Sequence, residues 1–220
     1  MTTQPGPGWT VIVPVKLIQL AKSRLRGFTP AARQRLAWAF ALDTVLAAAS
    51  SQAVDRVVVV TNDPDAARFE EVGAEVIGDQ PDAGLNPALS HAVRVVRRDA
   101  AVSVAALSAD LPCLRHEDLT RVLALAPAPR WFVPDWQGSG TTLLAAAGAA
   151  RWQPAFGESS RLRHLELGMV EVGLEGMERL RCDVDTLADL RAARLLGVGD
   201  HTSQVLVEHT FDDVPAEWLA

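Results

Sequence analysis

Short apolar runs alternate with longer segments of helical periodicity along most of the chain. The run RVVVVT at 56–61 is almost continuously apolar, which predicts a strand buried on both faces of a parallel sheet. In 85–98, by contrast, apolar residues recur every three or four positions, as they do on one face of a helix. The predicted strands are 10–15, 56–61, 74–77, 102–109, 131–133, 142–147, 171–173 and 179–184. The predicted helices are 30–52, 85–98, 116–126, 158–167 and 186–196, with a short helix opened by the turn TNDPD at 61–65.

This alternation predicts an α/β fold, namely a single three-layer α/β/α domain with a mostly parallel, mixed sheet. A chain of 220 residues with 49% apolar composition is well matched to one domain over 1–220. We expect 1–8 to be a flexible N-terminus and 200–220 to be a C-terminal tail. That tail is acidic, and it is compatible with an added strand, a docking segment or a frayed end; Trp218 favours docking.

Charge and composition exclude several classes of function. A net charge of −6 argues against broad nucleic-acid binding, which needs a basic footprint. No apolar run reaches the roughly 18 residues that span a bilayer, and MTTQPGPGW lacks the basic and apolar regions of a secretory signal. We therefore expect a cytoplasmic protein without a membrane partner. Cys113 and Cys182 are too few for a disulfide framework, and we expect both to be reduced and buried.

Positive charge gathers near the N-terminus, because no Asp or Glu precedes Asp43. The loop after the first predicted strand carries Lys16, Lys22, Ser23 and Arg24 in PVKLIQLAKSRL. Cationic groups and free backbone N–H groups at that place suit a nucleoside triphosphate, although the P-loop pattern is missing. A solvated basic loop is the alternative interpretation.

Acidic residues end two of the predicted strands. Asp110 closes the apolar run VSVAALSA and is followed by Leu111 and Pro112, which stops the strand there. Asp183 lies in RCDVD at the end of 179–184, with Asp185 close behind. Taken singly, Asp110 reads as a turn residue and Asp185 as a helix cap. Together, carboxylates from separate strand edges predict a magnesium site made of Asp110, Asp183 and Asp185.

Small residues form a third candidate region. The turn 138–141 (GSGT) is able to bring backbone N–H groups close to an anion, and 156–160 (FGESS) opens a helix whose N-terminus favours one. A hairpin turn and a helix cap are the alternatives. Arg161 and Arg163 add positive charge there, whereas His164 reads as a surface or capping residue. Asn86, in the turn before a helix, is a candidate for reading a base edge or for plain N-capping.

Other chemistries lack their motifs. G-x-S-x-G is absent, and no Cys and His spacing suits zinc. The dinucleotide fingerprint G-x-G-x-x-G is missing too, which argues against a Rossmann dehydrogenase.

The motifs PVKxxxxAKSRL, GLNPAL, SADLP, PDxxGSGTTLL, FGxxS and LRCDVDTxxDL occur in this order between 14 and 190. This ordered set resembles the 2-phospho-L-lactate or phosphoenolpyruvate guanylyltransferases of coenzyme F(420) biosynthesis. The resemblance implies a glycosyltransferase-A-like nucleotidyltransferase fold. It also implies that a phosphorylated three-carbon acid attacks the α-phosphate of GTP, that pyrophosphate leaves, and that the guanosine diphospho-linked product passes to the next enzyme.

The resemblance also implies roles for single residues. Asp110 and Asp183 hold magnesium, and Thr141, Gly157 and Ser159 bind the three-carbon acid. Lys16, Lys22 and Arg24 face the GTP phosphates. The residues alone leave open phosphoenolpyruvate, 2-phospho-L-lactate or 3-phosphoglycerate as the acceptor. They also leave open a related transferase acting on a sugar phosphate or molybdopterin, and a GTP-binding regulatory domain without turnover.

Overall fold

The computed structural model of the protein describes residues 8–18, 22, 24–25, 27–98, 101–173 and 175–209. Its strands are β1 (Trp9–Pro14), β2 (Val54–Val60), β3 (Glu75–Ile77), β4 (Val104–Leu107), β5 (Arg130–Pro134), β6 (Thr141–Ala146) and β7 (Val170–Glu171). Its α-helices are α1 (Pro30–Ala49), α2 (Leu85–Val96), α3 (His116–Leu125), α4 (Ser160–Glu166), α5 (Glu178–Arg181), α6 (Leu187–Leu196) and α7 (Asp200–His209). A 3₁₀ helix, η2, covers Ala66–Val72.

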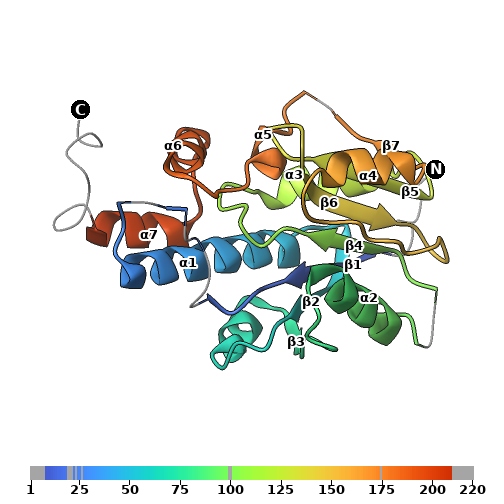
Figure 1. Ribbon diagram of the computed structural model, residues 1–220, viewed down its shortest axis with the longest axis horizontal. Helices are drawn as coiled ribbons and strands as arrows, with labels where there is room; N and C mark the ends of the chain where they lie inside the picture. The colour runs from blue at the N-terminus through green and yellow to red at the C-terminus, as the bar shows by residue number, and fades with distance from the viewer. Residues whose placement is uncertain are drawn as a thin grey trace.

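The strands form one sheet in the order β3-β2-β1-β4-β6-β5-β7 (Figure 1). β6 pairs antiparallel with β4 and with β5, whereas the remaining pairs are parallel. The chain builds β1, β2 and β3 outward in one direction and then returns to place β4 on the other side of β1. Such a reversal of strand order opens a crevice at the carboxyl ends of the strands, where α/β proteins bind ligands. The mixed, mostly parallel sheet confirms the predicted fold class.

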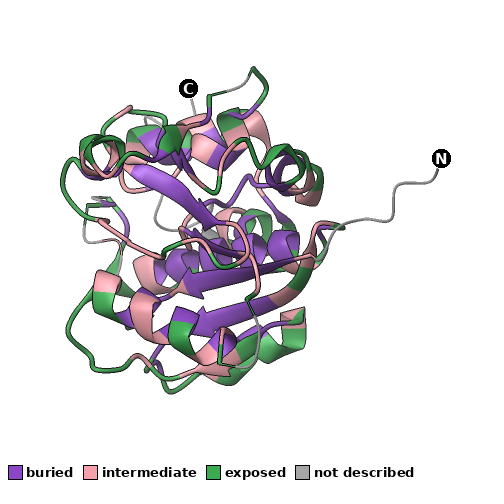
Figure 2. Cartoon of the chain, turned by 90° about the vertical axis from the view of Figure 1, so that its right-hand side faces the viewer, coloured by how far each residue is buried: buried purple, intermediate pink, exposed green. Residues whose placement is uncertain are grey.

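Both faces of the sheet are covered, so the domain has three layers. Successive residues of β1 point to opposite faces: Val11 and Val13 join the cluster that packs on α1 and α3, and Ile12 joins the one that packs on α2. Farther along the sheet, Phe132 of β5 packs on the α4 side with Met169. The buried residues lie along the strands and on the inner sides of the helices (Figure 2). The continuous apolar character of 56–61 therefore reflects burial from two sides.

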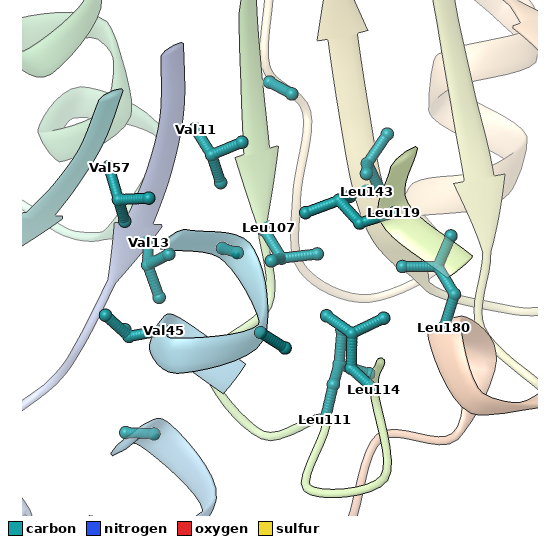
Figure 3. Close-up of a cluster of buried hydrophobic side chains, with 14 of the residues drawn as sticks. Val11, Val13, Val45, Val57, Leu107, Leu111, Leu114, Leu119, Leu143 and Leu180 are labelled. Carbon is teal, nitrogen blue, oxygen red and sulfur yellow. The ribbon is translucent and has the colours of Figure 1, made fainter. Parts of the chain in front are cut away.

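The larger core lies between the sheet and helices α1, α3 and α5. Figure 3 shows Val13 of β1 close to Val45 of α1, Leu107 on the neighbouring strand β4, and Leu111 and Leu114 beneath the end of β4; all five belong to one buried cluster. Leu107 and Leu111 are almost fully buried. Truncating a buried leucine to alanine typically costs about 2–5 kcal/mol. The segment that follows β4, including Asp110, is thus anchored by core residues on both sides.

Local signals explain where α1 begins. Thr29 is its N-cap, and its hydroxyl accepts the Ala32 N–H at 3.2 Å, while proline occupies the first helical position. The helix ends at Ala49, three residues before the end that periodicity predicts. Within the described residues, no helix has the length and apolar character that are needed to cross a membrane.

Two predictions for the C-terminal part are corrected. Residues 179–184, predicted as a strand, contain the end of helix α5 and a non-strand segment from Cys182 to Val184. The first ten residues of the expected tail, 200–209, form α7, which lies beside α1 (Figure 1). Trp218 lies outside the described residues.

Helix α7 is attached to α1 through a buried carboxylate. Asp43 of α1 accepts hydrogen bonds from the backbone N–H groups of His201 at 3.0 Å and Thr202 at 2.9 Å. These groups belong to the first turn of α7, where a helix has unsatisfied donors and favours negative charge. A Cβ on Gly199 would lie 2.4 Å from the Asp43 carboxyl carbon, so only glycine allows this approach.

We predict that Asp43→Ala lowers the free energy of unfolding by about 2 kcal/mol, because it removes the cap and leaves buried N–H groups without an acceptor. Chemical denaturation measures the change. Glu70→Ala, which removes an exposed carboxylate from η2, is the control and should stay within about 0.5 kcal/mol of the parent. Equal destabilisation by the two variants would contradict this account of α7.

Candidate active site

Two cavities open at the carboxyl edge of the sheet. The first has a volume of about 570 Å³ and is lined by residues that follow β1, β2, β3 and β4. The second has a volume of about 730 Å³ and is lined by the turn between β5 and β6, the start of α4 and the segment before α6. Both volumes fall in the range of small-ligand sites. Asp185 lines both cavities, so they meet beside this residue.

A lysine and two carboxylates stand where the cavities meet. The Lys22 ammonium lies 2.5 Å from Asp110 Oδ2 and 3.1 Å from Asp185 Oδ1. The Lys22 side chain is only 10% exposed, against 26% for Asp110 and 47% for Asp185. Short, charge-assisted bonds of this kind are among the stronger hydrogen bonds in proteins. They bring together three residues that the sequence places on separate segments.

The environment keeps Lys22 cationic. Burial lowers the pKa of a lysine, but the Asp110 and Asp185 carboxylates outweigh this effect, so that the pKa of Lys22 is raised. The residue has a φ of 57°, in the left-handed region that non-glycine residues seldom occupy. This uncommon backbone conformation accompanies the inward position of its side chain.

Asp183 reaches the site by a route that differs from the predicted one. Its segment is not a strand of the sheet; instead, the Val184 N–H donates to the Asp110 carbonyl at 3.0 Å and fixes the two segments side by side. Burial, followed by the charges of Asp110 and Asp135, raises the pKa of Asp183 to about 7. The predicted convergence of Asp110 and Asp183 is therefore correct, although a strand edge is not what carries Asp183.

Asp185 faces Lys22 and does not cap a helix. The N-cap of α6 is Thr186, whose hydroxyl accepts the Asp189 N–H at 3.3 Å, while the Asp189 carboxylate accepts the Thr186 N–H at 2.8 Å. The two residues thus form a reciprocal capping box at the start of α6. The Asp185 carboxylate is left to pair with Lys22 and, at 3.8 Å, with Arg24.

The acids suit a metal that takes few protein ligands. Among the described residues, no three or more His, Cys, Asp or Glu side chains are close enough together to hold a metal ion. Magnesium, however, is commonly bound by one or two carboxylates together with substrate phosphates. Burial, followed by the charges of Asp110 and Asp135, raises the pKa of Asp183, and a bound cation would stabilise the ionised carboxylate against both effects. The donor set of Asp110 and Asp183 thus fits magnesium.

The basic loop contributes to both cavities. Lys16 is exposed and lines the first cavity with Lys22, whereas Arg24 is 77% exposed and lines the second. Ser23, a predicted nucleotide contact, lies outside the described residues. The described cations of the loop are therefore divided between two neighbouring ligand spaces.

The GSG turn is held by an acid that sequence reasoning did not identify. Asp135 accepts the N–H groups of Ser139 and Gly140, each at 2.8 Å, and is buried. A Cβ on Gly140 would lie 2.4 Å from Asp135 Oδ2, which explains the glycine. The predicted use of these N–H groups for an external anion is thus wrong for Ser139 and Gly140. The available signal was an Asp preceding a small-residue turn, where its carboxylate satisfies the turn's backbone.

Thr141 belongs to a buried hydrogen-bond chain with His164. The Ala155 N–H donates to His164 Nε2 at 3.1 Å, which makes Nε2 an acceptor. In a neutral imidazole the proton is then on Nδ1, which lies 2.9 Å from Thr141 Oγ1. Thr141 also accepts from the Ser160 hydroxyl at 3.1 Å. With both lone pairs of its oxygen in use, the Thr141 O–H is left as a donor.

His164 is not the surface or capping residue that the sequence suggested. The side chain is fully buried and packs against Phe132 and Phe156, with ring centroids 5.4 Å away in each case. Burial and the nearby charge of Arg163 lower the pKa of His164 to about 4. The imidazole is neutral at physiological pH, as the hydrogen-bond chain requires.

Gly157 and Ser159, both predicted substrate contacts, line the second cavity and are exposed. They have φ values of 113° and 53°, so the chain makes a sharp turn before α4 begins. Arg161 is used within the protein, because it forms a bidentate pair with Glu171 at 2.8 and 3.2 Å. Arg163 donates to the Glu158 carbonyl. The charge predicted for these two arginines is therefore largely committed to the protein itself.

Asn86 does not present a free amide to a ligand. Its Nδ2 donates to the Phe156 carbonyl at 3.1 Å, and its Oδ1 accepts the Phe156 N–H at 2.9 Å. Asn86 also provides no side-chain cap, since the N-cap of α2 is Gly84. The side chain instead joins α2 to the loop before α4. Both earlier interpretations of Asn86 are replaced by this structural role.

The two cysteines lie beneath the acids, where both are buried and free. The Cys113 thiol lies 3.8 Å from the Arg179 carbonyl, to which it donates. A hydrogen bond to Cys113, together with burial, raises the pKa of Cys182. Both residues serve as small packing groups, as predicted.

Comparison with known proteins gives consistent relatives. The model of the family described as "Guanylyl transferase CofC like" matches residues 9–217. A phosphoenolpyruvate guanylyltransferase of Streptomyces avermitilis is 53% identical over 199 residues, which cover 89% of this chain and 92% of that protein. One of Geodermatophilus obscurus is 51% identical over 208 residues, which cover 90% of this chain and 94% of that protein.

Solved structures agree with the fold. A protein described as a nucleotide-diphospho-sugar transferase from Desulfovibrio desulfuricans G20 superposes with a TM-score of 0.68 at 17% identity, covering 91% of this chain and 94% of its own. A CMP:2-keto-3-deoxy-manno-octonic acid synthetase gives a TM-score of 0.53 at 17% identity, covering 86% and 98%. At such identities the likeness establishes the nucleotidyltransferase fold alone.

The buried His164 predicts how stability depends on pH. Its pKa in the folded protein, about 4, lies below the ordinary value of about 6.5, so the unfolded chain binds the proton more readily. The contribution of the neutral His164 to the free energy of unfolding is fully present above pH 6.5. It falls by about 3 kcal/mol as the pH drops from 6.5 to 4. Denaturation of the parent and of His164→Gln at several pH values measures the difference. An unchanged slope between pH 6.5 and 4 in the variant would contradict the buried, neutral assignment.

Proposed function

Because the chain belongs to the CofC-like guanylyl transferase family, we propose that it transfers GMP from GTP to phosphoenolpyruvate. The products are pyrophosphate and enolpyruvoyl-2-diphospho-5'-guanosine, a precursor for coenzyme F(420). Relatives that are 47–53% identical over about nine-tenths of the chain carry the name phosphoenolpyruvate guanylyltransferase, which favours this acceptor over 2-phospho-L-lactate.

The observation that carries this proposal is the meeting of two cavities at Lys22, Asp110 and Asp185. A transfer between two anionic substrates needs separate spaces for each and a shared point where their phosphates approach. The first cavity, beside Lys16 and Lys22, suits the nucleotide. The second, beside Arg24, Gly157 and Ser159, suits the smaller acid.

The chemistry requires positioning and charge compensation and no general base. A phosphate oxygen of the acceptor, already ionised at neutral pH, attacks the α-phosphorus of GTP. The new P–O bond forms as the bond to the bridging oxygen of the β-phosphate breaks, and pyrophosphate carries that oxygen away. Lys22 offsets negative charge on the phosphates, and the fixed geometry holds the two reactants close together.

Magnesium is the proposed cofactor, with Asp110 and Asp183 as its protein ligands and Asp185 at its edge. When bound, it would polarise the α-phosphate and neutralise part of its charge. With magnesium on the carboxylates, the Lys22 ammonium would interact with the substrate phosphates instead of with Asp110 and Asp185.

For the acceptor, we propose contacts with Thr141, Gly157 and Ser159. The Thr141 hydroxyl is supported by its free donor, which the His164 and Ser160 hydrogen bonds leave in place. Lys16, Lys22, Ser23 and Arg24 remain proposed phosphate contacts. We also place the enzyme in the cytoplasm, and we expect it to hand its product to the next enzyme of the pathway.

Mass spectrometry of the product tests this function. GTP, magnesium and equal amounts of phosphoenolpyruvate, 2-phospho-L-lactate and 3-phosphoglycerate are incubated with the protein. The proposal expects the phosphoenolpyruvate adduct of GMP to dominate. A dominant lactate adduct would replace the acceptor, and the absence of any adduct together with acceptor-independent GTP binding would favour a regulatory domain.

We predict that Asp110→Asn lowers kcat/KM for transfer by about 10³-fold, because it removes a charged ligand of the proposed magnesium, which would offset the negative charge of the phosphates. Pyrophosphate release measures the rate, and circular dichroism verifies the fold. The matched control is Asp55→Asn. Asp55 is exposed and lies at the start of β2, the end of the strand away from the site, so this variant should keep parent activity. Parent-like turnover in Asp110→Asn would refute the assignment.

Magnesium binding provides a readout that does not depend on turnover. Calorimetric titration should show magnesium binding at least about tenfold more tightly when GTP is present, since two carboxylates alone complete only part of its coordination. Asp183→Asn should remove this difference, and chelation should stop transfer until magnesium is returned. Equal magnesium affinity in the parent and the variant would argue against Asp183 as a ligand.

A further inference from the structure

One end of the first cavity carries polar residues that have no role in the proposed transfer of GMP. Asn62 follows β2, Asp79 follows β3, and Asp82 and Gly84 precede α2; all four line the cavity. Because β3 and β4 stand three positions apart in the sheet, Asp79 is about 14 Å from the Asp110 side, at about 4.8 Å per strand. This separation is enough to keep a nucleotide's base apart from its phosphates.

Asn62 fixes the backbone of Asp79. The Asn62 Nδ2 donates to the Asp79 carbonyl at 3.1 Å, and its Oδ1 accepts the Asp79 N–H at 2.9 Å. This two-point pairing resembles a short piece of sheet between the ends of β2 and β3. Asn62 therefore uses both its amino group and its carbonyl oxygen to position the backbone of Asp79.

The Asp79 carboxylate has a polar atom that lacks a partner. Asp79 Oδ1 is shielded from solvent and finds no hydrogen-bond donor among the described residues. A buried acceptor without a donor typically costs about 1–3 kcal/mol, and more when it is charged. Native proteins keep few such atoms, and those beside a ligand cavity are candidates for a contact that the ligand completes.

We propose that Asp79 reads the base of the nucleotide and selects guanine, a role that rests on the proposed guanylyl transfer. The Watson–Crick edge of guanine presents two adjacent donors, N1–H and the 2-amino group. A carboxylate accepts both, with one hydrogen bond to each oxygen. Rotation about the Asp79 χ2 angle, which has a broad energy profile, brings Oδ1 to the cavity as the base enters.

The same carboxylate disfavours the other purines. Adenine presents an acceptor at N1, which the carboxylate repels. Hypoxanthine, the base of ITP, lacks the 2-amino group, and xanthine has an oxygen there that faces the carboxylate. A site with buried polar groups rejects a ligand that leaves those groups unpaired far more strongly than an apolar site does. Leu85 and Ala88 supply the apolar part of the cavity that the base ring needs.

Asp82 is the matched comparison. It lines the same cavity and carries the same charge, but it is exposed and its carboxylate is not among the buried atoms without a partner. Water satisfies an exposed carboxylate, so a base gains little from replacing that water. Asp82 contributes negative charge without setting the choice of base.

The test is a change of base preference in Asp79→Asn. The asparagine amide keeps an acceptor for N1–H but places an N–H₂ donor against the 2-position, which repels the guanine amino group and welcomes the xanthine oxygen. We expect the affinity for GTP to fall about 100-fold and that for XTP to rise, so that the GTP-to-XTP ratio falls about 10³-fold. Calorimetric binding of each nucleotide with magnesium, without acceptor, measures the ratio, and Asp82→Asn should leave it unchanged.

The outcomes separate this proposal from the proposed function. An unchanged ratio in Asp79→Asn, loss of GTP without gain of XTP, or a shift in Asp82→Asn instead would overturn the role of Asp79, even if the parent transfers GMP. A shifted ratio in a protein that forms no adduct would uphold base reading and refute the transfer. A parent protein that binds GTP, ITP and XTP equally overturns the proposal without any variant.

Discussion

The ammonium group of Lys22, held between the carboxylates of Asp110 and Asp185, is the interaction on which the site depends. Without a cation at this point, the acids that the fold brings together would repel one another at short range. Burial, followed by the charges of Asp110 and Asp135, raises the pKa of the neighbouring Asp183. Lys22 thus compensates charge in the free protein and, as we propose, serves the nucleotide's phosphates when magnesium is present.

The fold brings these charges together through a few specific contacts. Core leucines on either side of Asp110 hold the end of β4, and the Val184 backbone N–H fixes the Asp183 segment beside it. Asp135 holds the GSG turn by accepting the backbone N–H groups of Ser139 and Gly140, so these two donors are not available to a ligand. Each ligand space therefore has a rigid frame, and the reacting groups meet at the junction between them.

Sequence patterns predicted the layers, the strands β1 to β6 and the place of Asp110, because buried strands and their ending residues carry local signals. Asp183 was predicted to lie near Asp110 from a strand that the structure does not contain. These patterns failed where the decisive contact is between distant segments. The hydrogen bond from Asn86 to the Phe156 carbonyl joins residues 70 positions apart, and neither residue type predicts it. The sequence suggested a surface position for His164, because its burial depends on packing against Phe132 and Phe156, which lie on other segments. Asp79 follows a three-residue strand and belongs to no recognisable motif. It is identified only in the structure, by its buried oxygen without a hydrogen-bond partner.

A structure of the reactant complex tests the central claim most directly. The protein would be crystallised with magnesium, phosphoenolpyruvate and a GTP analogue whose α–β bridging oxygen is a methylene, which prevents pyrophosphate from leaving. We expect the α-phosphorus beside Asp110 and Asp183, about 3–3.5 Å from an acceptor phosphate oxygen that arrives from the second cavity. A nucleotide seated in the second cavity, or an α-phosphate remote from both carboxylates, would contradict the account.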